Sequence, residues 1–185
     1  MVRLKTKLTL QDFFSLPVGD VNYEFVNGYA LPKVSPKYFH STLQSALLLL
    51  IHTWCKGKGR VVSEWAIILK RQGEDWVPIP DLTYISYERL PANWKRNEVC
   101  PIAPELVIEI ISPGQTSKQF VDKAQDYFKA GISRAWIVDP EALTIEVLSA
   151  DGVSQIYKDT TPIIDSLLPG LELTVNIIFE EAGLI

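Results

Sequence analysis

Glu109 is the one charged residue in the stretch LVIEIIS, residues 106–112. The other residues suit a buried strand, and on such a strand Val107 and Ile111 share a face with Glu109. A carboxylate in this setting is costly unless it is protonated, paired with a cation or bound to a metal ion. Taken alone, Glu109 favours a structural ion pair with an arginine or lysine over a functional role.

Asp81 adds a second carboxylate, at the start of the preceding predicted strand, in PIPDLTYIS. An aspartate after a proline is also common in simple turns. Two carboxylates that converge at one end of a sheet repel each other unless a proton or a cation lies between them. Carboxylate oxygens suit Mg²⁺ or Mn²⁺, and such an ion can polarise a phosphoryl oxygen and activate a bound water. Asp81 and Glu109 therefore predict a divalent metal site.

Lys123 is the third candidate, on a predicted helix that directly follows the Glu109 strand. It lies at the edge of the apolar helix face, whereas Asp122 and Asp126 are expected to point outward. A lysine at such an edge can bury its aliphatic stem and direct its ammonium group along the edge of the sheet. Lysines with no functional role often do the same. At the same end of the sheet as Glu109, that charge would stabilise a phosphate or orient the attacking water. The apolar face comprises Phe120, Val121, Ala124, Tyr127 and Phe128.

The elements that would position these residues follow from apolar periodicity and turn signals. A helix is predicted from Ser35-Pro36, with serine as N-cap and proline at the first helical position. Strands are predicted at residues 60–69, 76–86, 104–112 and 133–140. The helix that carries Lys123 begins with a capping box, Thr116 with Gln119, and ends at Gly131.

Additional elements flank this central part of the chain. Thr9 caps a short helix, Asn27-Gly28 marks a hairpin at residues 23–32, and Asp151-Gly152 marks another at residues 144–158. Thr174 caps a last short helix. We expect one domain over residues 1–185, with an N-terminal helix and hairpin (1–34), a catalytic core (35–140) and a C-terminal hairpin and helix (141–185). The fold class is α/β, as a mixed α+β sheet flanked by helices.

Composition excludes some function classes. The 185 residues are 47 % hydrophobic, enough for a substantial core, and the formal net charge of −4 argues against nucleic-acid binding by bulk electrostatics. Two cysteines provide neither a disulfide framework nor a zinc motif, so a cytoplasmic location is expected. No signal peptide and no run long enough for a membrane span is recognised, so no membrane partner is expected.

The order of these motifs resembles the Uma-two family of restriction endonucleases, in the PD-(D/E)XK nuclease superfamily. The resemblance covers nearly the whole chain, and no single motif in it is specific. It implies a restriction-endonuclease-like αβββαβ core with extra N- and C-terminal hairpins, and Asp81 and Glu109 as ligands of Mg²⁺ or Mn²⁺. The matching residues are YEFVNG (23–28), His40, Pro80-Asp81, PELVIEIISP (104–113), Lys123, Tyr127, AGI (130–132) and WIVDP (136–140).

The chain departs from the superfamily pattern at two places. A lysine usually lies two residues after the second carboxylate, but this position is Ile111 here, and the resemblance suggests that Lys123 has taken over its role. The first core helix usually carries an acidic residue. Its inward candidates here are His40 and Gln44, so Glu24 on the preceding hairpin is the expected substitute. The alternatives are a cross-strand surface pair for Glu24 and a hydrogen-bonded boundary position for His40.

The expected function is that of a Mg²⁺- or Mn²⁺-dependent endonuclease that hydrolyses DNA phosphodiester bonds. Asp81 and Glu109 would bind the metal ion, Lys123 and Glu24 would assist, and His40 and Gln44 would support the site. A catalytically inactive nuclease-fold module that binds DNA or protein is the main alternative, because the lysine within the motif is missing. A hydrolase of another phosphoester is a third hypothesis. A homodimer is expected, since two-fold symmetry suits cleavage of a duplex.

Overall fold

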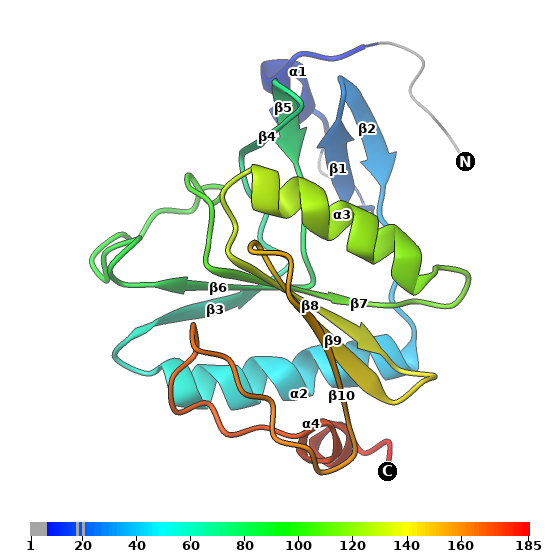
Figure 1. Ribbon diagram of the computed structural model, residues 1–185. Coiled ribbons are helices and arrows are strands. Elements are labelled where there is room, and N and C mark those ends of the chain that lie inside the picture. Colours follow the sequence, from blue (N-terminus) through cyan, green and yellow to red (C-terminus); the bar gives the residue numbers. More distant parts are fainter. Residues whose placement is uncertain (1–6, 18, 20) are drawn as a thin grey trace.

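Two sheets and four helices make up the computed structural model, which describes residues 7–17, 19 and 21–185 (Figure 1). The helices are α1 (Leu10–Phe14), α2 (Tyr38–Cys55), α3 (Ser117–Lys129) and α4 (Val175–Glu181). The larger sheet, in the order β10-β9-β8-β7-β6-β3, comprises β3 (Gly59–Ser63), β6 (Leu82–Ser86), β7 (Leu106–Ile110), β8 (Arg134–Asp139), β9 (Thr144–Ser149) and β10 (Ser154–Lys158). The smaller sheet, in the order β2-β1-β5-β4, comprises β1 (Tyr23–Val26), β2 (Tyr29–Pro32), β4 (Leu69–Arg71) and β5 (Glu74–Val77).

The central part of the larger sheet has the predicted order of elements. The strands β7 and β8 are parallel and are joined through α3, and the other neighbouring strands in this sheet are antiparallel. Together α2, β3, β6, β7, α3 and β8 form an αβββαβ core within a mixed α+β fold, which confirms the predicted fold class.

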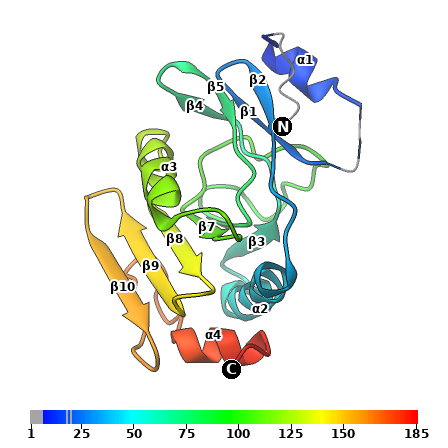
Figure 2. The same cartoon turned by 90° about the vertical axis from the view of Figure 1, so that its right-hand side faces the viewer.

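Helices cover both faces of the larger sheet, with α2 and α4 on one face and α3 on the other (Figures 1 and 2). The central strand β7 shows the resulting alternation. Leu106, Ile108 and Ile110 belong to the core that includes α2 and α4, whereas Val107 belongs to the core that includes α3. Because side chains alternate along a strand, Glu109 shares the face of Val107 and points towards α3.

Two of the predicted strands are wrong in their extent, because each divides between the two sheets. The predicted strand 60–69 ends as β3 at Ser63, and its last residue opens β4. The predicted strand 76–86 contains the end of β5 and the whole of β6. Pro78 and Pro80 lie between these parts and lack the N–H groups that a continuous ladder requires. As a result β4 and β5 form a hairpin that pairs with β1 and completes the smaller sheet.

Local capping and turn signals correspond more closely to the structure. Asn27 and Gly28 adopt φ of 52° and 85° in the turn between β1 and β2, as a tight hairpin requires. The capping box of Thr116 at the start of α3 is present. The helix predicted from Ser35 begins at Tyr38 instead, with Lys37 as its N-cap. Within the described part of the chain, no helix combines the length and apolar character needed to cross a membrane.

Candidate metal centre

A cavity of about 140 Å³ lies between the larger sheet, α3 and the N-terminal hairpin, and several predicted site residues line it. Gln44 is not among the lining residues, but its side-chain amide donates a hydrogen bond of 2.9 Å to the backbone carbonyl of Asp81. The structure therefore brings segments that are distant in sequence around one small polar space. The predicted residues in its lining are Glu24, His40, Asp81, Glu109 and Lys123.

Asp81 lies immediately before β6 and is 2 % exposed. Its Oδ2 accepts a hydrogen bond of 2.7 Å from the backbone N–H of Ile110, which fixes the carboxylate against β7. Its Oδ1 lies 3.1 Å from Lys33 Nζ and 3.4 Å from His40 Nε2. Burial raises the pKa of Asp81, but the contacts with His40, Lys33 and Ile110 together outweigh it and lower the pKa, which keeps the carboxylate ionised.

Glu109 projects from β7 towards α3, where its carboxylate has two partners. Its Oε1 accepts a hydrogen bond of 2.6 Å from the Tyr127 hydroxyl and lies 2.9 Å from Lys123 Nζ. Both of these contacts involve Oε1, and Glu109 also lines the cavity. Burial raises the pKa of Glu109, and the positive charge of Lys123 offsets this increase only in part.

Lys123 connects two carboxylates from different layers of the fold. Its Nζ lies 2.8 Å from Glu24 Oε1 and 2.9 Å from Glu109 Oε1. Burial alone would lower the pKa of Lys123, but the charges of Glu109 and Glu24 raise it. Glu24 also accepts a hydrogen bond of 3.0 Å from the backbone N–H of Ile79. Glu24 is therefore tied to the site and is not the surface cross-strand pair considered as its alternative.

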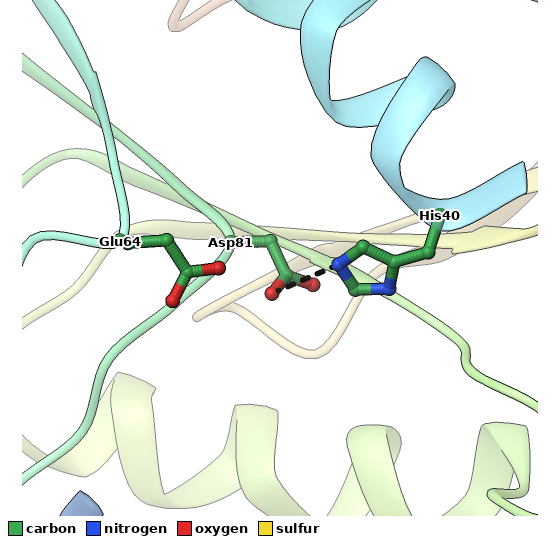
Figure 3. Close-up of side chains that lie close together, drawn as sticks. All are labelled: His40, Glu64 and Asp81. Atoms are coloured by element: carbon green, nitrogen blue, oxygen red, sulfur yellow. Dashed lines mark ion pairs between the residues drawn. The ribbon is translucent and has the colours of Figure 1, made fainter. Parts of the chain in front are cut away.

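Glu64 and Lys33 also belong to this region, although no sequence pattern marks either residue. One ligand atom from each of His40, Glu64 and Asp81 lies within 4.8 Å of the others (Figure 3). Lys33 Nζ lies 2.8 Å from Glu64 Oε2, and Gln44 donates a hydrogen bond of 3.1 Å to Glu64 Oε1. Glu64 follows β3 with a φ of 51°, a left-handed conformation that is unfavourable for a side chain of this type.

His40 holds its orientation through both ring nitrogens. Its Nδ1 lies 3.0 Å from the Ser112 hydroxyl, and its Nε2 faces Asp81 at 3.4 Å. A ring held in this way presents one nitrogen to the carboxylates and fixes the other with a neighbouring group. His40 is thus both a buried, hydrogen-bonded residue and a neighbour of the candidate metal ligands.

The donor set fits a divalent cation. Carboxylate oxygens from Asp81, Glu64 and Glu109 are the ligands that Mg²⁺ and Mn²⁺ prefer, and the His40 nitrogen suits Mn²⁺ as well. Two ammonium groups already lie between carboxylates, Lys33 between Glu64 and Asp81 and Lys123 between Glu24 and Glu109. Of the predicted pair, only Asp81 belongs to the tight group with His40 and Glu64, and Glu109 lines the same cavity as Asp81 outside that group.

Two aspartates on α3 and the residue after β7 define the surroundings of the site. Asp126, predicted to point outward, is instead buried and forms an ion pair of 2.7 Å with Arg71 of β4. The prediction for Asp126 is wrong because the smaller sheet covers this side of α3. Asp122 is exposed and pairs with Lys118 within α3. Ile111, in the usual place of the lysine, packs against the core on the α3 side.

The mixed sheet, the αβββαβ order and the acidic cavity at the strand ends together define a restriction-endonuclease-like fold. A solved structure described as "Crystal structure of a putative nuclease belonging to DUF820 from Anabaena variabilis ATCC 29413" has this fold, with a TM-score of 0.82 and 24 % identity over 95 % of this chain and 99 % of that chain. The Uma2 family model, described as "Putative restriction endonuclease", matches residues 10–176, and the chain belongs to this family. A comparison with curated proteins gives no match.

Proposed function

We propose that the protein is a Mg²⁺- or Mn²⁺-dependent endonuclease that hydrolyses DNA phosphodiester bonds. The observation that carries this proposal is that Glu24, Asp81, Glu109 and Lys123 line one small cavity, although they come from four separate segments. Membership of a family of restriction endonucleases supports the same reaction class. A buried ion pair alone would not require two further carboxylates and a second lysine at the same place.

Asp81 and Glu109 would hold the metal ion, and Glu64 and His40 lie close enough to Asp81 to complete the ligand set. Such an ion polarises the scissile phosphoryl oxygen and lowers the pKa of a bound water. The Tyr127 hydroxyl and the Ile110 N–H hold the two carboxylates in fixed orientations.

Lys123 is the residue we propose to act in place of the usual lysine of the motif. Its ammonium group lies at the cavity and can stabilise negative charge on the phosphate while the water oxygen bonds to phosphorus and the bond to the leaving oxygen breaks. Glu24 acts as a positioning residue, because its carboxylate holds Lys123 from the side opposite to the larger sheet.

The proposal is tested by cleavage of a labelled DNA duplex and a single strand with Mg²⁺, Mn²⁺ or EDTA. We expect activity only with a divalent ion, and a loss of at least about 100-fold in Asp81→Asn and Glu109→Gln, more than the change of a residue that only orients a ligand. Asp122→Asn is the matched control, since Asp122 is an exposed carboxylate on α3. Undiminished cleavage by either site variant would refute the assignment.

Two observations favour a second candidate function, a catalytically inactive module that binds DNA or protein. Ile111 occupies the position of the usual lysine, and Lys33 and Lys123 are each engaged by two carboxylates. Calorimetric titration with Mn²⁺ separates the two functions. A metal-dependent enzyme should show binding that Asp81→Asn removes, whereas an inactive module should show no such site. The homodimer stays a prediction, which light scattering of the purified protein would test.

A further inference from the structure

A second and larger cavity, of about 370 Å³, lies directly beside the candidate metal centre. It is formed by the beginning of α2, the connection from β7 to α3 and the turn between β8 and β9. Figure 2 views the molecule from the side on which α2 and α3 both begin. His40, Ser112 and Gln115 line both cavities, so a bound molecule could extend from one into the other without leaving the protein surface.

Two exposed aromatic side chains stand at the rim of this second cavity. Tyr38 is 67 % exposed and Phe39 is 52 % exposed, and their ring centroids lie 5.9 Å apart at the start of α2. Neighbouring aromatic rings left in contact with water are characteristic of binding surfaces. Pro113 and Pro140 add flat apolar surface to the lining, and its charged residues are Lys37, Asp139 and Glu141.

We propose that this cavity binds one unpaired nucleotide of the substrate strand, next to the phosphate that is cleaved. The inference rests on the proposed function and specifies its substrate class as single-stranded or locally unpaired DNA. Aromatic rings stack on any base, and the size of the cavity is at the lower end of the range for small-molecule pockets. A base within an intact duplex cannot enter such a pocket unless it is first turned out of the stack.

The charge of the chain supports the same substrate class. A formal net charge of −4 is not typical of a protein that holds an intact duplex by bulk electrostatics. Stacking in a pocket provides affinity that does not depend on bulk electrostatics. The alternative partner for the aromatic pair is a second copy of this chain. Variants of the pair distinguish this dimer contact from nucleotide binding.

The test compares the dissociation constants of three labelled oligonucleotides, measured by fluorescence anisotropy in Ca²⁺. Cleavage of the same oligonucleotides is checked by gel in parallel samples that contain Mg²⁺ or Mn²⁺. The three are a fully paired duplex, the same duplex with one central mismatch, and the single strand. We expect the mismatched duplex and the single strand to bind at least about tenfold more tightly than the paired duplex, because the cost of unstacking is reduced or absent.

Two variants locate this preference in the cavity. Tyr38→Ala with Phe39→Ala should weaken binding of the single strand by about 5- to 150-fold, the range for loss of base stacking. Ser117→Trp, which keeps the aromatic pair but fills the cavity, should also remove the preference. Phe14→Ala is the control, because Phe14 is an exposed aromatic on α1, 45 % exposed, and the variant should bind within twofold of the original protein.

Equal affinities for the three oligonucleotides, or a double variant that binds like the original protein, would overturn the proposal. A double variant that instead loses self-association, with unchanged DNA affinity, would assign the aromatic pair to a dimer interface. Tighter binding of the mismatched duplex and the single strand, with no cleavage in Mg²⁺ or Mn²⁺, would refute the endonuclease but support the nucleotide cavity. Cleavage with equal affinities for the three oligonucleotides would refute only the nucleotide cavity.

Discussion

The ion pair between Lys123 and Glu109 provides the most direct test of the site without any assay of activity. Lys123→Met keeps a long side chain of good helix propensity but removes the ammonium group. Glu109 is 5 % exposed and would lose its charged partner, 2.9 Å away. Removal of one partner from a buried pair costs about 3–5 kcal/mol, and we expect the lower end, about 3 kcal/mol, because the Lys123 side chain is 22 % exposed.

Thermal unfolding followed by circular dichroism in EDTA measures this loss. For a chain of this size, about 3 kcal/mol corresponds to a decrease in Tm of about 6–12 °C. Lys118→Met is the matched control on the same helix, because the Lys118 side chain is 81 % exposed and its pair with Asp122 contributes little. Equal Tm values for the two variants at pH 8 would refute the assigned role of Lys123 as the partner of Glu109.

The loss should also depend on pH in a definite direction. The pKa of Glu109 is raised in the folded protein, so the folded state binds more protons than the unfolded state at pH values above the ordinary glutamate pKa. Stability therefore decreases as the pH rises from the ordinary glutamate pKa to the raised pKa of Glu109. Lys123→Met moves the upper end of this pH range higher, because it removes the positive charge that lowers the pKa of Glu109. The Tm difference between the variant and the original protein should be smaller at pH 5 than at pH 8.

Buried contacts elsewhere in the chain set three further expectations. Arg134 Nε lies 2.8 Å from an Asp165 side chain that is 2 % exposed, so Arg134→Ala should lower the free energy of unfolding in urea by about 3 kcal/mol, and a negligible loss would contradict a structural role. Gly131 has a φ of 99°, so Gly131→Ala should cost about 1 kcal/mol in the same titration. Cys55 and Cys100 are buried, and burial raises the pKa of Cys100 to about 11, so rapid labelling by a maleimide at pH 8 is expected only after denaturation.

The sequence predicts those parts of the fold that depend on neighbouring residues. The Asn27-Gly28 turn and the capping box at Thr116 are local, and each forms at the expected place. The sequence pattern does not predict that two apolar runs divide between the two sheets. Alternating apolar residues look the same in one long strand and in two shorter strands that belong to different sheets. Only Pro78 and Pro80 marked one of these breaks.

The same distinction applies to the candidate site, where sequence patterns mark some residues and not others. Asp81 and Glu109 stand out because each is a charge beside apolar strand residues. Lys33 and Glu64 have no such contrast with their neighbours. Lys33 contacts Asp81 across 48 positions of sequence, and Glu64 lies where β3 has already ended. Their role depends on how the smaller sheet docks on the larger one, which no local pattern encodes.

The replacement of the usual lysine by Ile111 becomes understandable from the charges around the cavity. A lysine at this position would supply one positive charge from β7, on the face towards α3. In this chain Lys33 and Lys123 reach the carboxylates from outside β7, one from the end of the N-terminal hairpin and one from α3. In their ionised forms, the four carboxylates and two ammonium groups carry a formal charge of −2. One divalent cation balances that charge, so Ile111 removes a lysine from the motif without removing the electrostatic conditions that a metal ion requires.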